Sequence, residues 1–105
     1  MPKYLVTYHG GGPMPEAAEA REQMMAAFGA WAASVGEAMV DPGAPLVAFK
    51  TVSTAGAADG QTEAAIGGYT VLEAADLDAA VAFVEGHPFV GRGGSLQVSE
   101  AAVLG

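Results

Sequence analysis

The order of strand-like and helix-like segments constrains the fold of this chain more than any other feature of the sequence. A β-rich segment comes first, and a long segment with helical spacing of its apolar residues follows. Two strand-like segments, a second amphipathic segment and a last strand-like segment complete the order. The expected elements are strands over 3–9, 46–53, 68–74 and 94–100, and helices over 16–35 and 77–85.

Both helical segments carry one apolar face. In the first, apolar side chains recur at steps of four, three and four residues, which aligns Met24, Phe28, Trp31 and Val35. This stripe predicts packing against a sheet, and a ligand-stacking role for Trp31 stays open. In the second, Asp76 is a suitable N-cap, and the side chains expected to be buried are Leu77, Ala80, Val81 and Val84.

The order β-α-β-β-α-β is that of a ferredoxin-like α+β fold, with a four-stranded antiparallel sheet and both helices on one face. At 105 residues the chain is expected to form one domain, residues 1–105. Yet both faces of the predicted strands carry apolar residues, as Tyr4 and Val6 do on one face and Leu5 on the other. A second copy of the sheet is the simplest cover for the face without helices. The sequence therefore predicts a C2 homodimer of the dimeric α/β-barrel kind.

The segments around the second predicted strand are expected to be connections. In residues 38–46, Asp41, Pro42 and Gly43 are typical of a tight turn. Residues 54–68 are expected to form a long loop, within which Asp59 and Gly60 suit the turn of a hairpin.

Charge and composition exclude several classes of function. A net charge of −8, with only four scattered bases, disfavours binding to nucleic acid or to an anionic membrane. The absence of cysteine excludes disulfides and thiol chemistry, and the two histidines lack the spacing of a helical metal pair. We expect no metal and no cofactor. Without a signal-like start or a membrane-spanning apolar run, a cytoplasmic location is expected.

Three stretches resemble the YCII-related proteins, including their DGPF branch. They are "KYLVTYHGG" at the start, "DG…IGGYTVLEAADLDAAVAFVEGHP" in the centre and "GRGGSLQV" near the end. Each is short, but their order and spacing follow the family along nearly the whole chain. The resemblance implies a ferredoxin-like dimeric α/β barrel, in agreement with the element order. Some members accompany alternative sigma factors, which implies a regulatory role as an alternative to catalysis.

The biochemistry of that family is mostly undetermined, and this chain departs from its better-studied branch. That branch is thought to use a helix-one histidine with a nearby aspartate as an acid/base pair in the cleft between subunits. Here Met24 or Met25 stands at the histidine's place, so the pair is broken. The DGPF signature is also partial, because Gln61 and Thr62 follow Asp59-Gly60.

Two residues are candidates for acid/base chemistry. His9 ends the first strand just before three glycines, which would allow a ligand to approach the backbone closely. Asp41 lies in the connector after the first helix, the region that supplies the family's aspartate. The alternatives are a half-exposed strand-end histidine and a turn-forming aspartate. Whether His9 and Asp41 meet is left open by the sequence.

The glycine-rich stretch over 84–98 is a poor match to a phosphate-binding loop. Such loops run from a strand into a helix N-terminus, whereas here a helix precedes the glycines and a strand follows. His87 is expected chiefly to cap the helix end, where the dipole would raise its pKa, and a ligand role is the alternative. Arg92, one of only four bases, is a candidate anion contact or a partner for an acidic side chain.

Polar side chains on the inner faces of the last strands suit a small, partly polar ligand. They are Tyr69, Gln97 and Ser99, with interface hydrogen bonding as the equal alternative. The leading hypothesis is a homodimer that binds a small molecule, with weak acid/base chemistry on a small organic acid or lactone-like substrate. His9 and Asp41 would be catalytic, and Tyr69, Arg92, Trp31, Gln97 and His87 would contact the ligand. A non-catalytic interaction or regulatory module is the alternative.

Overall fold

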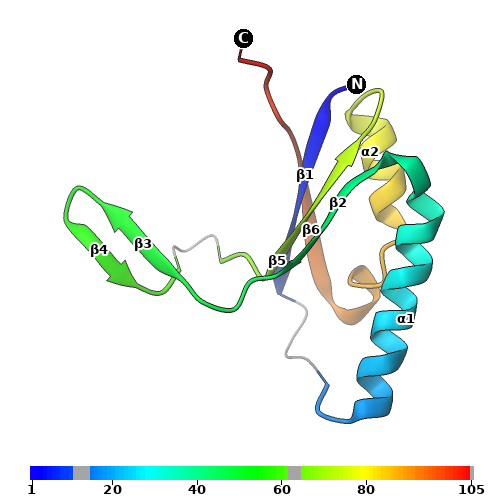
Figure 1. Cartoon of the computed structure of the whole chain (residues 1–105), viewed down its shortest axis with the longest axis horizontal. Coiled ribbons are helices and arrows are strands. Elements are labelled where there is room, and N and C mark those ends of the chain that lie inside the picture. The colour runs from blue at the N-terminus through cyan, green and yellow to red at the C-terminus, as the bar shows by residue number, and fades with distance from the viewer. Residues whose placement is uncertain (11–14, 62–64, 105) are drawn as a thin grey trace.

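The computed structural model describes residues 1–10, 15–61 and 65–104 (Figure 1). Two of the three glycines after His9, Gly11 and Gly12, lie outside the described residues, and so does Thr62. The strands are β1 (Lys3–Gly10), β2 (Met39–Pro45), β3 (Lys50–Ser53), β4 (Gly56–Asp59), β5 (Gly68–Glu73) and β6 (Gly94–Glu100). The helices are α1 (Ala18–Val35) and α2 (Leu77–Glu85), with short 3-10 turns at Gly36–Ala38 and Val90–Arg92.

Four strands form one antiparallel sheet in the order β2-β5-β1-β6. Both helices lie on the same side of it, as Figure 1 shows. The expected α+β fold of the ferredoxin-like kind is therefore confirmed, with β1 central and β6 at an edge. Among the described residues, no helix is long and apolar enough to cross a membrane.

The second strand of the sheet lies earlier in the chain than the sequence predicts. β2 is formed by the segment that contains Asp41, Pro42 and Gly43, which was expected to be a turn. Its pairing with β5 shifts register twice, between Met39 and Asp41 and between Asp41 and Ala44. A proline is tolerated here because β2 is an edge strand with bulges, where the missing N–H breaks no ladder.

The segment predicted as the second strand instead enters a separate hairpin. β3 and β4 pair only with each other in a two-stranded sheet, from Lys50 opposite Asp59 to Ser53 opposite Gly56. The turn is thus at Thr54-Ala55, and Asp59 ends a strand rather than forming the turn. The expected loop over 54–68 contains β4. The hairpin stands away from the sheet on the side opposite the helices (Figure 1).

The core lies between the sheet and the helices, as the apolar periodicity predicts. Its fully buried side chains include Tyr4, Val6 and Leu72 from the strands, packed with others from the helices. On α1 the stripe is buried at Trp31 and Val35 and half-buried at Met24 and Phe28. On α2 the structure buries Ala80 and Val84, whereas Leu77 and Val81 stay 45% and 37% exposed. The expectation that these two positions are buried is therefore wrong.

The N-terminus of α2 begins where the sequence predicts. The Asp76 carboxylate accepts a hydrogen bond of 2.8 Å from the backbone N–H of Ala79. The side chain thereby satisfies one of the free N–H groups of the first turn, which fixes the helix start. α1 begins two residues after the expected Glu16.

The sheet's other face carries no helix, and we call it the open face. The cross-strand register places its residues side by side on three neighbouring strands, since alternate residues of a strand share a face. They are Lys3, Leu5, Thr7, His9, Tyr69, Val71, Glu73, Ser95, Gln97 and Ser99.

Candidate functional site

A row of polar side chains crosses the middle of the open face. Thr7 on β1 lies directly opposite Tyr69 on β5 and Gln97 on β6. Opposed residues on one sheet face have Cβ atoms about 5 Å apart. The side chains of Tyr69, Thr7 and Gln97 therefore leave the sheet next to one another on the same face. Gln97 also donates a hydrogen bond of 3.1 Å to the Ser99 hydroxyl.

His9 is joined to this row through Nε2, and its Nδ1 contacts a backbone carbonyl outside the row. Nδ1 lies 3.0 Å from the backbone oxygen of Ala65, and Nε2 lies 2.9 Å from the Thr7 hydroxyl. A carbonyl oxygen only accepts, so Nδ1 carries the proton in the neutral ring, and Nε2 accepts from Thr7. Hydroxyl, imidazole and an orienting acceptor thus stand in the order that nucleophile or acid/base pairs use.

Asp41 does not meet His9. Asp41 is opposite Val71, which is opposite Leu5, so it lies one strand beyond β5 and four residues from His9 along the sheet. That is about 13 Å along the strands and about 10 Å across them. The Asp41 carboxylate instead accepts a hydrogen bond of 2.8 Å from the backbone N–H of Gly43. This contact agrees with the alternative interpretation of Asp41 as a turn-forming residue. The structure does not bring Asp41 and His9 together as an acid/base pair.

A second polar group lies on the opposite, helix-covered face of the same strand. The His87 Nε2 lies 2.9 Å from the Tyr8 hydroxyl, which lies 2.6 Å from the Thr70 hydroxyl. Thr70 then donates a hydrogen bond of 2.9 Å to the backbone oxygen of Pro42. The His87 Nδ1 accepts from the N–H of Phe89, so the proton is on Nε2 and every donation runs from His87 toward Pro42.

His87 is enclosed by aromatic rings. Its ring centroid lies 4.3 Å from that of Trp31, 5.0 Å from Tyr8 and 5.6 Å from Phe28. The side chain is only 5% exposed. Burial disfavours the charged ring and lowers the pKa of His87 to about 4. The expectation that the helix dipole raises this pKa is therefore wrong, because desolvation outweighs the dipole in a buried position. Burial also raises the pKa of Tyr8.

Arg92 and Trp31 lie on the helix side of the sheet. The Arg92 guanidinium carbon is 5.7 Å from the centre of the Phe89 ring, which also lies near the rings of Tyr8 and His87. The indole N–H of Trp31 donates a hydrogen bond of 2.8 Å to the backbone oxygen of Phe83, which holds α1 against α2. Neither residue lies beside the polar row on the open face.

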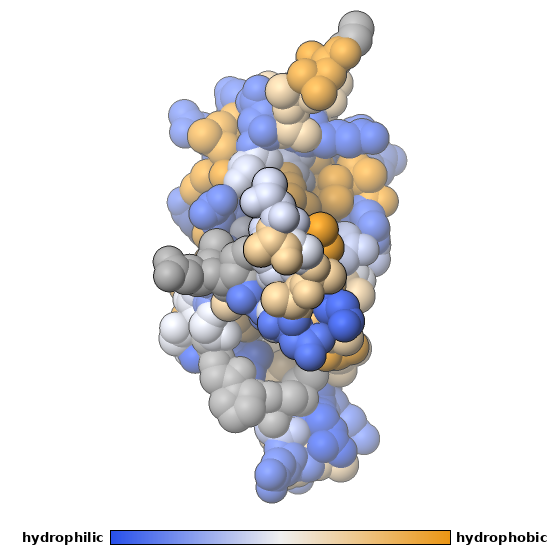
Figure 2. All heavy atoms as spheres, turned by 90° about the vertical axis from the view of Figure 1, so that its left-hand side faces the viewer, coloured by the Kyte–Doolittle hydropathy of each residue, from blue (hydrophilic) through white to orange (hydrophobic). Residues whose placement is uncertain are grey.

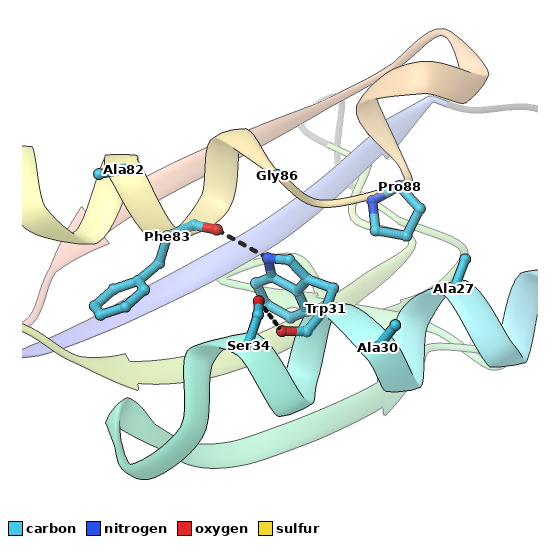
Figure 3. Close-up of a pocket in the computed structure, with 8 residues that line it drawn as sticks. All are labelled: Ala27, Ala30, Trp31, Ser34, Ala82, Phe83, Gly86 and Pro88. Atoms are coloured by element: carbon cyan, nitrogen blue, oxygen red, sulfur yellow. Dashed lines mark hydrogen bonds between the residues drawn. The ribbon is translucent and has the colours of Figure 1, made fainter.

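A groove of about 550 Å³ runs between the two helices (Figure 3). The Trp31 ring forms part of its wall, with the Ser34 hydroxyl beside it. Its lining is made largely of small residues: Ala27, Ala30, Ala82, Gly86 and Pro88, together with Phe83. Within the described ranges, no group of three or more histidine, aspartate or glutamate side chains is placed to hold a metal ion.

Three hydroxyl groups in the hydrogen-bond networks of the two histidines were not predicted from the sequence. Thr7 follows from the alternation that puts it on the same strand face as His9. Tyr8 and Thr70 have no comparable signal, because their partners His87 and Pro42 are far away in sequence.

The chain was compared with known families, curated proteins and solved structures. The YCII-related domain matches residues 9–101. No curated protein matches the sequence. Among solved structures, the chain is similar to the 5-chloro-2-hydroxyhydroquinone dehydrochlorinase TftG from Burkholderia phenoliruptrix AC1100, in complex with 2,5-dihydroxybenzoquinone. The TM-score is 0.52 at 20% identity, over 92% of this chain and 91% of that one. This likeness supports the fold, and the domain match shows that the chain belongs to the YCII-related family.

Proposed function

We propose that the protein is a homodimer that binds a small, partly polar organic molecule on the open face, with His9 as its acid/base group. The observation that supports this most directly is the Thr7–His9 hydrogen bond, next to Tyr69 and Gln97, on a sheet face without helices. A face of this kind combines a titratable ring with neighbouring donors and acceptors.

The chemistry would be proton transfer at the Nε2 atom of His9. Because the Ala65 carbonyl keeps the proton on Nδ1, the lone pair of Nε2 points toward the Thr7 hydroxyl. A ligand hydroxyl or carboxyl group could take the place of Thr7 and exchange a proton with this nitrogen. Tyr69 and Gln97 would orient the ligand from either side. A phenol, a small organic acid or a lactone-like compound fits these groups.

The homodimer is supported by the character of the open face. Its apolar residues Leu5 and Val71 continue across neighbouring strands, and Leu5 is 41% exposed. Most acidic side chains instead lie in or beside the helices: Glu16, Glu19, Glu22, Glu37, Asp76, Asp78 and Glu85. Two copies can therefore meet across the open face without bringing most of their negative charge together.

The structural neighbour suggests one probe. Its bound 2,5-dihydroxybenzoquinone is a small oxygenated ring, a class of compound compatible with the donors and acceptors beside His9. For this chain it serves as a test compound, next to phenol and benzoate. Membership of the DGPF branch and a cytoplasmic location stay predictions.

Thermal unfolding in the presence of these compounds tests the proposal. The wild type and Ser34→Ala, which changes the helix groove, should be stabilised by at least one compound. His9→Ala should lose that stabilisation. If Ser34→Ala lost the stabilisation by the compound and His9→Ala retained it, the compound would bind in the helix groove, and the proposal would be overturned. No stabilisation of the wild type by any compound would favour the alternative, a non-catalytic interaction module.

A further inference from the structure

The hairpin of β3 and β4 stands apart from the four-stranded sheet, and its two strands pair only with each other. We call residues 46–61 the arm; it leaves the sheet after Pro45, and the chain re-enters the sheet at Gly68. In Figure 1 the arm extends to the left, away from the helices. Figure 2 looks onto that side, and there the arm points toward the viewer. The arm therefore projects on the side of the open face.

The arm exposes apolar side chains that a solitary hairpin would not need. Val47 is 89% exposed and Val52 is 78% exposed. Val52 shares a face of the hairpin with Ala57, its direct cross-strand partner. A two-stranded hairpin alone is at best marginally stable in water, so a covered arm is expected to be more stable than an exposed one.

We propose that the arm lies against the second copy of the chain and reaches across the dimer interface. This inference rests on the proposed homodimer through the open face. Stacked sheets lie about 10 Å apart, so a copy that docks on the open face must meet an arm that projects from the same side.

Charge also favours a second copy as the occupant of the arm. The Lys50 ammonium and the Asp59 carboxylate lie 3.0 Å apart and neutralise each other. They are the charged residues of the arm, so it is neutral in a chain of net charge −8. A neutral, partly apolar arm can approach an acidic copy of the same protein without repulsion, whereas no basic patch on it would select an anionic partner.

The arm is connected to the candidate site at its base. The N–H of Leu46 donates to the oxygen of Gly67 at 2.9 Å, and the N–H of Gly67 donates to the oxygen of Tyr8 at 2.7 Å. Two residues before Gly67, the Ala65 oxygen holds the Nδ1 proton of His9. A partner that fixes the arm therefore also fixes the carbonyl that sets the tautomer of His9. Each site would be positioned by the other subunit.

Sedimentation equilibrium of two matched variants tests whether the arm contributes to the dimer interface. Val52→Asp should raise the dimer dissociation constant at least about tenfold, since it removes a valine from the interface and adds a charge. Met25→Asp, at a position 63% exposed on α1, should leave the constant within about twofold. Equal effects of the two variants would overturn the arm contact. Circular-dichroism melts at low concentration check that both variants fold.

Cross-linking distinguishes a dimer that lacks the arm contact from a protein that does not dimerise. The chain has no cysteine, so single cysteines can be placed at will. A tagged Val52→Cys copy is mixed with an untagged copy that carries Ser95→Cys or Ser99→Cys on the open face, or Ala33→Cys on α1. A short bismaleimide should join tagged and untagged chains through Ser95→Cys or Ser99→Cys. If a dimeric protein gives no such product, or gives one only through Ala33→Cys, the proposed contact between the arm and the partner's open face is contradicted. A monomeric wild type contradicts the homodimer itself.

Discussion

His87 and Tyr8, 79 positions apart in the chain, are joined by a hydrogen bond of 2.9 Å beneath the sheet. The bond connects the segment after α2 to the middle of β1. Tyr8 stands between Thr7 and His9 in the sequence, and its side chain points to the opposite face. The buried chain of hydrogen bonds therefore supports from behind the strand that carries the candidate site.

Removal of the Tyr8 hydroxyl should destabilise the protein. Tyr8→Phe leaves the N–H of His87 and the hydroxyl of Thr70 without this shared partner in the core. We expect a loss of about 1–3 kcal/mol in the free energy of unfolding, measured by urea denaturation. Ser34→Ala, which removes an exposed hydroxyl on α1, should cost no more than about 0.5 kcal/mol. Equal costs for the two variants would contradict a structural role of the buried chain.

Acid should weaken the fold through His87. Its pKa falls from the usual 6.5 in the unfolded chain to about 4 in the folded protein. Between these values the unfolded state binds a proton that the native state does not, so the free energy of unfolding falls as the pH is lowered through this window. Urea denaturation between pH 7 and pH 5 should show this decrease in the wild type and in His9→Ala. His87→Gln should show a smaller slope, and an unchanged slope would contradict the assignment.

The bulge of β2 should tolerate no side chain at Gly43. Its φ is +75°, and a Cβ there would collide with the backbone carbonyl of Tyr69. Gly43→Ala should cost about 2–5 kcal/mol, from the left-handed backbone and the overlap together. At Gly91 a Cβ would meet nothing within 4 Å, so Gly91→Ala is the matched control. If the thermal melts of Gly43→Ala and Gly91→Ala coincide, the close approach of β2 and β5 is ruled out.

A charge on the open face should separate the subunits. Leu5 and Val81 have similar exposed fractions, 41% and 37%, but lie on opposite sides of the molecule. Leu5→Asp should weaken the dimer by more than about tenfold, because it places a carboxylate in the proposed interface. Val81→Asp should leave it unchanged. Light scattering over a concentration series measures both, and dissociation of the Val81→Asp variant instead would place the interface on the helices.

Local patterns predict most of the fold, and they fail where distant contacts decide. The stripe at Trp31 and Val35 and the cap at Asp76 are local, and both are confirmed. The second strand was misplaced because Asp41-Pro42-Gly43 has turn chemistry, and only the neighbouring β5 turns this segment into a bulged edge strand.

The candidate site shows the same division. Alternation along β1 and the two strands beside it places Thr7, His9, Tyr69 and Gln97 on one face, and this follows from the sequence once the strands are in register. The burial of His87 does not follow from the sequence, because a histidine after a helix-ending glycine is equally compatible with an exposed cap. Its enclosure depends on rings from α1 and β1 that only the tertiary structure brings together.

The most direct test of the proposed site is a long-range ¹H–¹⁵N spectrum of the two histidine side chains, recorded with and without the compound that most stabilises the wild type. In the free protein we expect opposite neutral tautomers, with the proton on Nδ1 in His9 and on Nε2 in His87. The compound should shift the Nε2 resonance of His9 and leave His87 unchanged. A shift confined to His87, or no shift in either ring, would contradict a binding site on the open face.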